Sequence, residues 1–571
     1  MTRQTAATRA LPGSVQVLVA GGGPVGLAAA VELGRRGISC LVVEPRAEVS
    51  HARPRCKTVN VRTMEHLRRW GLAGRFRAAV SLPVSWSQDI VFCTSLAGHE
   101  LWRFTGVLGL TPEGDRFPEP GQQAPQYILE EMLRDVVAEL SCCTLATGLR
   151  VAALRQDPSA VQVTVENAAG RQLVVEAGYV LGCDGPRSTV REQIGARYTG
   201  EYALRPNFGM VFHAPGLWQQ VRHGPAVQFW TVNDRTPALM GPIDLNGTWW
   251  IIAFGVEADE GRRTAMSLIE GAVGAPVDAR ILSDDPWTAR MQLADRLRCG
   301  RVFLAGDAAH LNPPFGGHGL NTGIGDAVDL GWKLAAVLDG WGGEALLDSY
   351  ELERRPVQDR IIREATQNMK TLSTDLLAAN LDDDTPAGQQ ARHEAGLRIQ
   401  QAKAAEFHSL DLVLGIGYDG SPIVAPGDQP PSGQSAPDQP GPGARPGGRL
   451  PHVWLGPDHS IYDRLGNGMT LMVLDQDRVT GSWAGLVQAA QASGVPLDVL
   501  DLRGRDLRAR YGAALVLVRP DQHVAWRADA PPTDPGAVLN RARGVAPRPT
   551  SPPFPGRNDL PARTLTGRSD L

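Results

Sequence analysis

The sequence predicts an α/β protein in which a parallel-sheet domain is interleaved with a second, sheet-rich domain and followed by a smaller α/β module. Three observations predict this class. A strand–helix–strand pattern around a glycine-rich turn stands near the N-terminus of the 571-residue chain. Strand-like pieces fill the middle of the chain, and long helical patterns follow them. A stretch dense in Pro, Gly, Ser and Gln then separates the last strands and helices from the rest.

The N-terminal unit is the reason to expect a parallel sheet. Residues 15–20 form a continuous apolar run rich in β-branched side chains, which is typical of a strand buried on both faces. A helix-like segment at 27–37 and a second apolar run at 39–43 follow. This order predicts a βαβ unit.

The turn inside this unit has the spacing of a dinucleotide site. Gly21, Gly23 and Gly26 fit G-x-G-x-x-G: the first makes the tight turn, the second lets the backbone approach a pyrophosphate, and the third allows close helix–strand packing. The helix N-terminus offers N–H groups to the phosphates. Glu44 ends the second strand, where an acid binds ribose hydroxyls, so we expect FAD or NAD rather than NADP. The alternative is a glycine-rich turn in some other α/β protein.

Further elements follow along the chain. In the middle and later regions we expect strands at 226–231, 248–254 and 302–305, and helices at 322–338 and from 344 to about 400. Beyond the Pro/Gly-rich stretch we expect further strands and one helix, with strands at 469–474, 496–500 and 513–518 and the helix at 482–492.

Two later turns place an acid beside a glycine directly after an apolar run. Asp184 follows one such run, and Gly306-Asp307 follows another, with an aspartate that looks buried. His310, two prolines and a burst of glycines come next, before the long helical pattern. These turns, together with the N-terminal βαβ unit, resemble the class A flavoprotein monooxygenases, the family of para-hydroxybenzoate hydroxylase.

The resemblance implies that the nucleotide is FAD. In that family the second Gly-Asp pair, here Gly306-Asp307, holds ribityl hydroxyls, and the acid at Asp184 serves both FAD and the reduced nicotinamide. The glycine loop lays backbone N–H groups against the O2 and N1 side of the flavin, and a helix that begins near Gly319 directs its positive end there. Pro314 matches the family's proline beside the reactive C4a carbon.

One branch of the family is more similar. Four segments resemble the phenol and 2,4-dichlorophenol hydroxylases, namely 52–65, 126–130, 332–334 and 348–356. By position, Arg55 matches an arginine near the FAD pyrophosphate, with a surface charge as the alternative, and Gln126 matches a glutamine near the flavin. Lys57 stands where phenol hydroxylases carry an acid near the substrate, and His318 stands where para-hydroxybenzoate hydroxylase has a lysine. We therefore assign no catalytic base.

The terminal module resembles the thioredoxin-like domain of the same branch. It has no cysteine, because Cys299 is the last one in the chain, so redox chemistry by that domain is excluded and an interface or lid-supporting role is expected. The expected fold is a Rossmann-like FAD-binding domain with an interleaved β-sheet substrate domain and this module. The boundaries are 14–80 and 291–420 for the two parts of the FAD-binding domain, 81–290 for the mixed FAD-binding and substrate region, 421–450 for a linker, 451–545 for the thioredoxin-like domain and 546–571 for a disordered tail.

These motifs give a set of candidate site residues. The expected cofactor contacts are Gly21, Gly23, Pro24, Val25, Gly26, Glu44, Pro45, Arg46, Arg55, Gln126, Asp184, Gly306, Asp307, Pro314, Gly316, Gly317, Gly319, Leu320 and Asn321. Pro314, as a wall beside C4a, and His310 are the candidates for the catalytic region. A functional polar contact and a packed structural group are equally compatible with His310. No metal site is predicted.

The expected function is hydroxylation of a phenolic or polyketide-type aromatic by an FAD-dependent monooxygenase that uses NADH or NADPH and O2, through a flavin C4a-hydroperoxide. The substrate would lie on the sheet of the middle domain. Phe229, Trp230, Trp249 and Trp250 fall on its expected strands, where adjacent positions point to opposite faces, so at most about half could line a pocket. A Baeyer–Villiger or epoxidising monooxygenase is one alternative, and a non-catalytic aromatic-binding flavoprotein is another. A dehydrogenase that binds NAD at the N-terminal site is a third.

The composition and charge of the chain limit the kinds of partner and the cellular location that we expect. The net charge of −4 gives no basic field for nucleic acid, and no apolar run reaches the length of a membrane span. The N-terminus lacks the apolar segment of a secretory signal, and the seven cysteines lack C-x-x-C spacing, so free thiols in a cytoplasmic protein are expected. The branch resemblance also indicates a homodimer.

Overall fold

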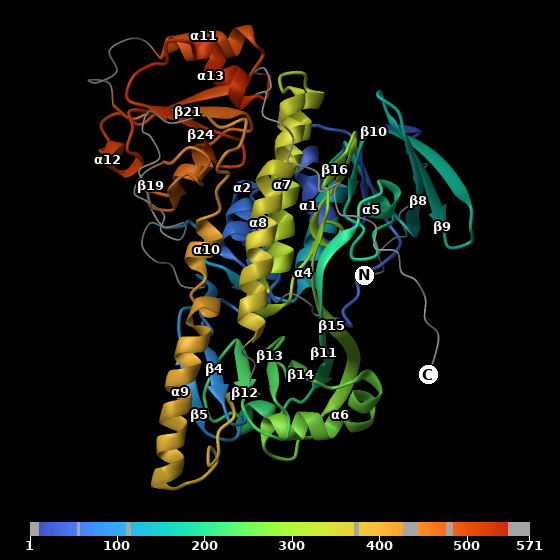
Figure 1. Ribbon diagram of the computed structural model, residues 1–571, viewed down its shortest axis with the longest axis vertical. Coiled ribbons are helices and arrows are strands. Elements are labelled where there is room, and N and C mark those ends of the chain that lie inside the picture. The colour runs from blue at the N-terminus through green and yellow to red at the C-terminus, as the bar shows by residue number, and fades with distance from the viewer. Residues whose placement is uncertain are drawn as a thin grey trace, which may run out of the picture.

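The computed structural model describes residues 11–53, 57–109, 116–370, 376–425, 444–475 and 483–545. Figure 1 shows the sheet of the expected substrate domain at the lower end, the sheet of the expected FAD-binding domain with its helices in the centre, and the C-terminal module at the upper left. The two sheets are called the substrate-domain sheet and the FAD-binding sheet below. The two long helices α7 and α8 run between the module and the FAD-binding sheet. The predicted fold class is confirmed. Within the described residues, no helix combines the length and apolar character that a bilayer crossing requires.

The FAD-binding sheet contains the strands that appear in the sequence as continuous apolar runs. It has the order β16-β17-β10-β1-β2-β7, in which the strands from β17 to β7 are parallel. These strands are β1 (Ser14–Ala20), β2 (Cys40–Glu44), β7 (Cys143–Thr147), β10 (Gln172–Gly182), β16 (Arg298–Cys299) and β17 (Val302–Leu304). A hairpin of β8 (Leu149–Gln156) and β9 (Val161–Asn167) extends the sheet from β10. The central strands are buried, as expected for a parallel sheet covered by helices.

Helices pack on this sheet in one core. They are α1 (Pro24–Gly34), α2 (Val61–Arg69), α3 (Ala73–Ala79), α4 (Gln126–Glu139) and α7 (His318–Leu338), with the short α5 (Thr189–Gln193) after β10. The helix expected from residue 322 begins four residues earlier, because the glycine loop leads directly into it with Gly317 as N-cap. The helical region expected from 344 to about 400 does not form one continuous helix. It is two helices, α8 (Glu344–Lys370) and α9 (Pro386–Phe407), because Thr385 caps a new helix that starts with Pro386.

The substrate-domain sheet has the order β18-β15-β11-β14-β13-β12-β4-β5. Its strands are β4 (Ile90–Cys93), β5 (Glu100–Phe104), β11 (Tyr198–His213), β12 (Gln228–Thr231), β13 (Ala238–Pro242), β14 (Thr248–Phe254), β15 (Arg280–Ala294) and β18 (His310–Leu311). One face packs against α6 (Ala258–Val273) and the other against α9. A small ladder of β3 (Thr58–Val59) and β6 (Gln122–Gln123) lies close to the glycine loop, where Thr58 contacts Gly317.

The C-terminal module contains a sheet in the order β22-β21-β23-β24, with β21 and β22 parallel and the other pairs antiparallel. Its strands are β21 (Met469–Val473), β22 (Leu497–Asp501), β23 (Leu515–Val518) and β24 (Val524–Ala528), and its helices are α11 (Ala484–Ala492), α12 (Arg508–Tyr511) and α13 (Pro535–Ala542). Ahead of them lie α10 (Leu410–Leu414), β19 (Trp454–Gly456) and β20 (His459–Ser460). This mixed order agrees with the predicted thioredoxin-like module.

The predicted linker at 421–450 is wrong at both ends. Ile423 is buried in the core of the module, and Ala425 donates its backbone N–H to the carbonyl of Ala525. Leu450 is buried as well and pairs with the backbone of Gln522. The high Pro and Gly content hides these anchoring apolar residues from a compositional reading. The central part, 426–443, and the predicted disordered tail at 546–571 lie outside the described residues.

Candidate functional site

The turn after β1 has three glycines with three different surroundings. Gly21 has φ +102°, and a Cβ there would lie 2.3 Å from the carbonyl oxygen of Cys183. A Cβ on Gly26 would lie 2.0 Å from the carbonyl oxygen of Gly21, so the helix can approach the strand only without a side chain. A Cβ on Gly23 would meet no atom within 4 Å. The open space therefore lies in front of Gly23, at the N-terminus of α1, where Pro24 takes the first helical position.

Glu44 closes the edge of this space at the end of β2. Its side chain is buried, and Oε2 accepts the backbone N–H of Gly22 at 2.8 Å. Its Oε1 accepts Nε of Arg46 at 2.7 Å, and Arg46 also pairs with Glu130 at 3.1 Å. Carboxylate oxygens accept more than one hydrogen bond, so these contacts leave capacity for sugar hydroxyls. Pro45 is exposed beside them.

The Gly306-Asp307 turn departs from one expectation. Asp307 is exposed rather than buried, so its carboxylate faces the open side of the sheet. Gly306 has φ +58°, and a Cβ there would come within 2.9 Å of Val25 on α1. The turn and the glycine-rich turn after β1 therefore meet at the carboxyl ends of β17 and β1, two parallel strands on either side of β10, and ligands of such sheets bind at this edge.

The buried acid of this region is Asp326 on α7. Its side chain is fully buried and accepts the backbone N–H of Gly306 at 3.2 Å and Nε of Arg354 at 2.8 Å. Burial by itself would raise the pKa of Asp326, but the Arg354 guanidinium and the bond from His310 outweigh it and hold the pKa below its usual range. Asp326 therefore anchors the Gly306 turn from behind as a carboxylate.

His310 points toward this anchor. Its ring is buried, and Nε2 lies 3.0 Å from Oδ2 of Asp326. Nδ1 has no hydrogen-bond partner among the described residues. The geometry therefore favours the structural alternative, in which His310 helps to position the turn and does not face the open side.

The glycine loop leads into α7, and parts of it are open to solvent. Pro314 is exposed while Pro313 is buried, and Gly316 and Gly317 have φ +81° and +66°. A Cβ on Gly319 would meet no atom within 4 Å, and the first turn of α7 contains no acid. The positive end of α7 therefore faces free space.

Asn321 fixes this loop instead of presenting its side chain to a ligand. Its Nδ2 donates to the carbonyls of Thr58 and Gly317, at 2.9 and 2.7 Å. Its Oδ1 accepts the backbone N–H of Asn60 at 3.0 Å. Leu320, the residue before it, is half-buried. Contact between Asn321 and a cofactor would therefore involve its backbone.

The remaining candidates lie at the edges of the site. Asp184 accepts bonds from the Ser188 hydroxyl and the Val190 N–H, so it supports the start of α5, whose N-cap is Ser188, and burial raises the pKa of Asp184. Gln126 is the first residue of α4 and is half-buried. Arg55 lies outside the described residues.

Two further residues touch the loop and were missed from the sequence. Glu406 on α9 is buried, accepts the backbone N–H of Gly316 and pairs with Lys403 at 2.8 Å. The Lys403 ammonium lies 4.7 Å from the ring centre of Trp230. Glu406 lies about 90 positions beyond the loop that it holds, so no local spacing could have indicated the contact.

The four aromatic residues of the substrate-domain sheet divide between its two faces. Phe229 and Trp249 belong to the core against α6. Trp230 faces the glycine loop, with its ring centre 6.1 Å from that of Phe315. Trp250 lies beneath Lys57, whose Nζ is 3.9 Å from the ring centre. The face toward the loop is therefore aromatic and carries a cation.

Comparison with known proteins identifies the chain. Residues 14–365 match the FAD binding domain family, and residues 443–546 match the aromatic-ring hydroxylase C-terminal family. The chain belongs to this flavoprotein family. It is 32% identical to a putative polyketide hydroxylase of Streptomyces halstedii, covering 90% of this chain and 94% of the relative. It is 31% identical to the 2,4-dichlorophenol 6-monooxygenase of Delftia acidovorans, with the same coverage of both chains.

Solved structures of the family agree. The rebeccamycin biosynthetic enzyme RebC with reduced flavin superimposes with a TM-score of 0.84 at 34% identity, covering 94% of this chain and all of RebC. Aklavinone-11 hydroxylase in complex with FAD and aklavinone gives a TM-score of 0.76 at 29% identity, covering 92% and 98% of the two chains. The chain is therefore an FAD-dependent aromatic monooxygenase that uses NAD(P)H and O2.

The described residues fit FAD. Open space faces Gly23 and Gly319, and each belongs to a helix N-terminus without an acid in its first turn. Helix N-termini of this kind bind phosphates and other negative charge. Asp307 is exposed, and a carboxylate can accept hydrogen bonds from sugar hydroxyls.

Proposed function

We propose that the protein hydroxylates a phenolic or polyketide-type aromatic ring, and that its FAD extends from the turn at Gly23 to the loop at Gly319. The pyrophosphate would lie at the N-terminus of α1, Asp307 would accept ribityl hydroxyls, and the flavin would lie along the loop from Pro314. The two open positions and the exposed Asp307 support this placement. Glu44, Arg46, Asp184 and Gln126 would act at the rim, through the contacts described above.

The observation that supports the substrate class is the aromatic side of the sheet toward the loop, where the Lys57 ammonium lies over the Trp250 ring and the buried Trp230 packs near Phe315. Sites for aromatic ligands are mostly lined by apolar and aromatic side chains with a few polar groups, which is the composition of this side of the sheet. The ammonium matches an ionised phenol or a carboxylate on the same ring. An ionised phenol also makes the ring richer in electrons, which favours attack by an electrophilic oxygen.

Reduced by NAD(P)H, the bound flavin supplies the activation of O2 that oxygen transfer to a ring requires. The protein supplies position and electrostatics. The first turn of α7 stabilises negative charge near it. The buried cluster of Trp230, Phe315 and Phe254 keeps water from this side of the site. Pro314 forms the exposed wall of the loop and His310 positions the Gly306 turn through Asp326.

The test is NAD(P)H oxidation by the FAD-loaded protein with phenols, naphthols and polyphenolic polyketides, each with and without an acidic substituent. We expect acceleration by a subset of these compounds and a product heavier by one oxygen atom, with the new hydroxyl located on the ring by NMR. A ring-expanded product would indicate a Baeyer–Villiger reaction instead. Tight binding of aromatics without any turnover would contradict the proposal and favour a binding protein. The homodimer and the cytoplasmic location stay predictions of the sequence.

A further inference from the structure

The C-terminal module inserts charged side chains deep into the FAD-binding domain. Arg519, at the end of β23, is completely buried. Its guanidinium pairs with Glu353 on α8 at 2.6 Å and with Asp329 on α7 at 3.0 Å. It also pairs with Asp521 in its own turn at 2.6 Å. Lys333 on α7 completes the group, at 2.8 Å from Asp329 and 2.6 Å from Glu353.

The charges on the two sides of this contact complement each other. On the FAD-binding side, the buried and half-buried ion pairs at this contact have three cations against four carboxylates, which are Arg62, Lys333 and Arg354 with Glu65, Asp326, Asp329 and Glu353. The described part of the module adds two cations and one carboxylate, which are Arg449 and Arg519 with Asp521. Neither side is balanced alone, and the whole set is balanced when every group is ionised. Leaving a buried charge without its partner is strongly unfavourable, so each side depends on the other.

A series of ring contacts and hydrogen bonds connects Arg519 to the Gly306-Asp307 turn. The Arg519 guanidinium lies 5.0 Å from the ring centre of Tyr418, and the ring of His523 lies 4.3 Å from it. The Tyr418 hydroxyl accepts Nη1 of Arg354 at 3.3 Å. Arg354 in turn donates to Asp326, which holds the backbone N–H of Gly306. Arg354 also holds a carbonyl in the second turn of α7, at Thr322.

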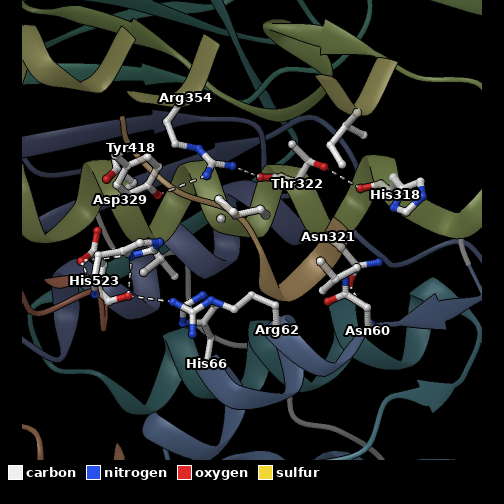
Figure 2. A pocket seen from close by; sticks show the side chains of 16 residues that line it. Asn60, Arg62, His66, His318, Asn321, Thr322, Asp329, Arg354, Tyr418 and His523 are labelled. Carbon is white, nitrogen blue, oxygen red and sulfur yellow. Dashed lines mark hydrogen bonds and ion pairs between the residues drawn. The ribbon is translucent and has the colours of Figure 1, made fainter. Parts of the chain in front are cut away.

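A small cavity lies between the two sides (Figure 2). Its volume is about 40 Å³, enough for about three water molecules. Figure 2 shows the α7 side chains above it, Arg62 and His66 below it, and Tyr418 and His523 at one end. Nδ1 of His66 and Nε2 of His523 are buried and have no partner among the described residues, so water in the cavity would satisfy them. Asp329 lines the same cavity and can therefore exchange protons with that water.

We propose that the C-terminal module is a positioning part of the flavin site, and that the Arg519–His523 turn sets the geometry of the Gly306-Asp307 turn through Tyr418, Arg354 and Asp326. The inference rests on the FAD site proposed above. It gives a role to a module that has no cysteine and no redox chemistry of its own.

The ionisation of Asp329 allows a test that separates the proposed positioning role of Arg519 from a purely structural role. A purely structural role would not make the effect of an Arg519 substitution depend on pH. Burial raises the pKa of Asp329 to about 8 even though Lys333 and Arg519 lie beside it, and Glu353 and Asp521 add to the rise. Removing Arg519 would raise this pKa further. A proton on Asp329 would then restore the balance at low pH, whereas at high pH the set would keep an unpaired charge. The loss of FAD affinity in an Arg519 variant should therefore increase with pH.

The experiment measures the FAD dissociation constant of the full-length apoprotein at pH 6.5 and pH 9, with circular dichroism and the unfolding midpoint as controls for folding. The variants are Arg519→Met, Arg519→Met with Asp329→Asn, and Tyr418→Phe. Arg503→Gln is the matched control, because Arg503 pairs with Asp501 on the solvent-exposed edge of the same module. Measuring the FAD dissociation constant needs no substrate. The proposed role of the module can therefore be refuted without refuting the proposed hydroxylation.

We expect Arg519→Met to bind FAD about tenfold more weakly than the parent protein at pH 9 and much less so at pH 6.5. Adding Asp329→Asn should remove most of this pH dependence. Tyr418→Phe should weaken binding about threefold, and Arg503→Gln should have no effect. Folded Arg519→Met with the parent affinity at pH 9 would overturn the proposal, as would an equal defect at both pH values without rescue by Asp329→Asn. If Arg519→Met does not fold, parent affinity in Tyr418→Phe would overturn it.

Discussion

Two alanine substitutions three positions apart should have opposite signatures if the turn after β1 holds a pyrophosphate. Gly23 has φ −77° and ψ 179°, which alanine adopts without strain, and its Cβ would meet no protein atom within 4 Å. Gly23→Ala should therefore change the free energy of unfolding of the apoprotein by less than about 1 kcal/mol. The same methyl group would fill the space that the pyrophosphate needs. We expect FAD affinity to fall at least about tenfold, or about 1.4 kcal/mol.

Gly26→Ala should act on folding instead. Its Cβ would lie 2.0 Å from the carbonyl oxygen of Gly21 and 3.1 Å from the side chain of Val19. A backbone oxygen cannot rotate away as a flexible side chain can, so α1 must move off the sheet. Overpacking of this kind costs about 1–3 kcal/mol, and the backbone contact places Gly26→Ala at the upper end.

The assay for both variants is urea unfolding of the apoprotein together with FAD titration by fluorescence. Parent-like FAD affinity in Gly23→Ala would refute the assignment of the open space to the cofactor. Parent-like stability in Gly26→Ala would refute the close helix–strand contact.

Substitutions at His318, at Lys57 and at the two neighbouring tryptophans test other features of the molecule. Burial lowers the pKa of His318 to about 4, below the ordinary value near 6.5, so the neutral ring contributes stability that is complete above about pH 6.5 and is lost as the pH falls toward 4. In urea unfolding, His318→Gln should reduce the loss of stability between pH 7 and pH 5 by about 2 kcal/mol, and an unchanged loss would contradict this. Lys57→Met should raise the KM for acidic aromatics about tenfold and leave the KM for neutral ones unchanged in steady-state assays, and equal effects on both would count against an anion contact. Trp249→Ala should lower the free energy of unfolding by about 3–5 kcal/mol in urea unfolding, because it leaves a cavity in the core against α6. Trp250→Phe should mainly raise KM in steady-state assays. The reverse pattern would show that the two faces of the sheet are misassigned.

The elements that the sequence predicted well are those encoded by local patterns. The βαβ unit depends on an apolar run, a fixed glycine spacing and a second run, all within residues 15–44. β14 (Thr248–Phe254) agrees with its predicted range because six of its seven residues are apolar and all but Ala253 are β-branched or aromatic. The opposite faces of Trp249 and Trp250 follow from the two-residue period of a strand.

The contacts that support the candidate site were not predictable in this way. Asp326 and Arg354 read as ordinary charges on helical patterns, and only the packing of α7 on α8 shows that they are buried together. Glu406 reaches the glycine loop from α9, about 90 positions later in the chain, and Arg519 reaches α7 from the C-terminal module. No periodicity in a single sequence links residues this far apart. β24 was missed for a different reason, since Pro520 and Asp521 are typical of a turn and its strand is short.

The central claim is that this chain transfers one oxygen atom from O2 to an aromatic ring at the FAD site. The most direct measurement is turnover of an accepted phenol under heavy-isotope O2, with mass spectrometry of the product. We expect one heavy oxygen atom in the new ring hydroxyl, and no label when the heavy isotope is supplied as water instead. A product whose new oxygen comes from water would contradict the claim, as would NAD(P)H consumption that yields only hydrogen peroxide with every aromatic tested.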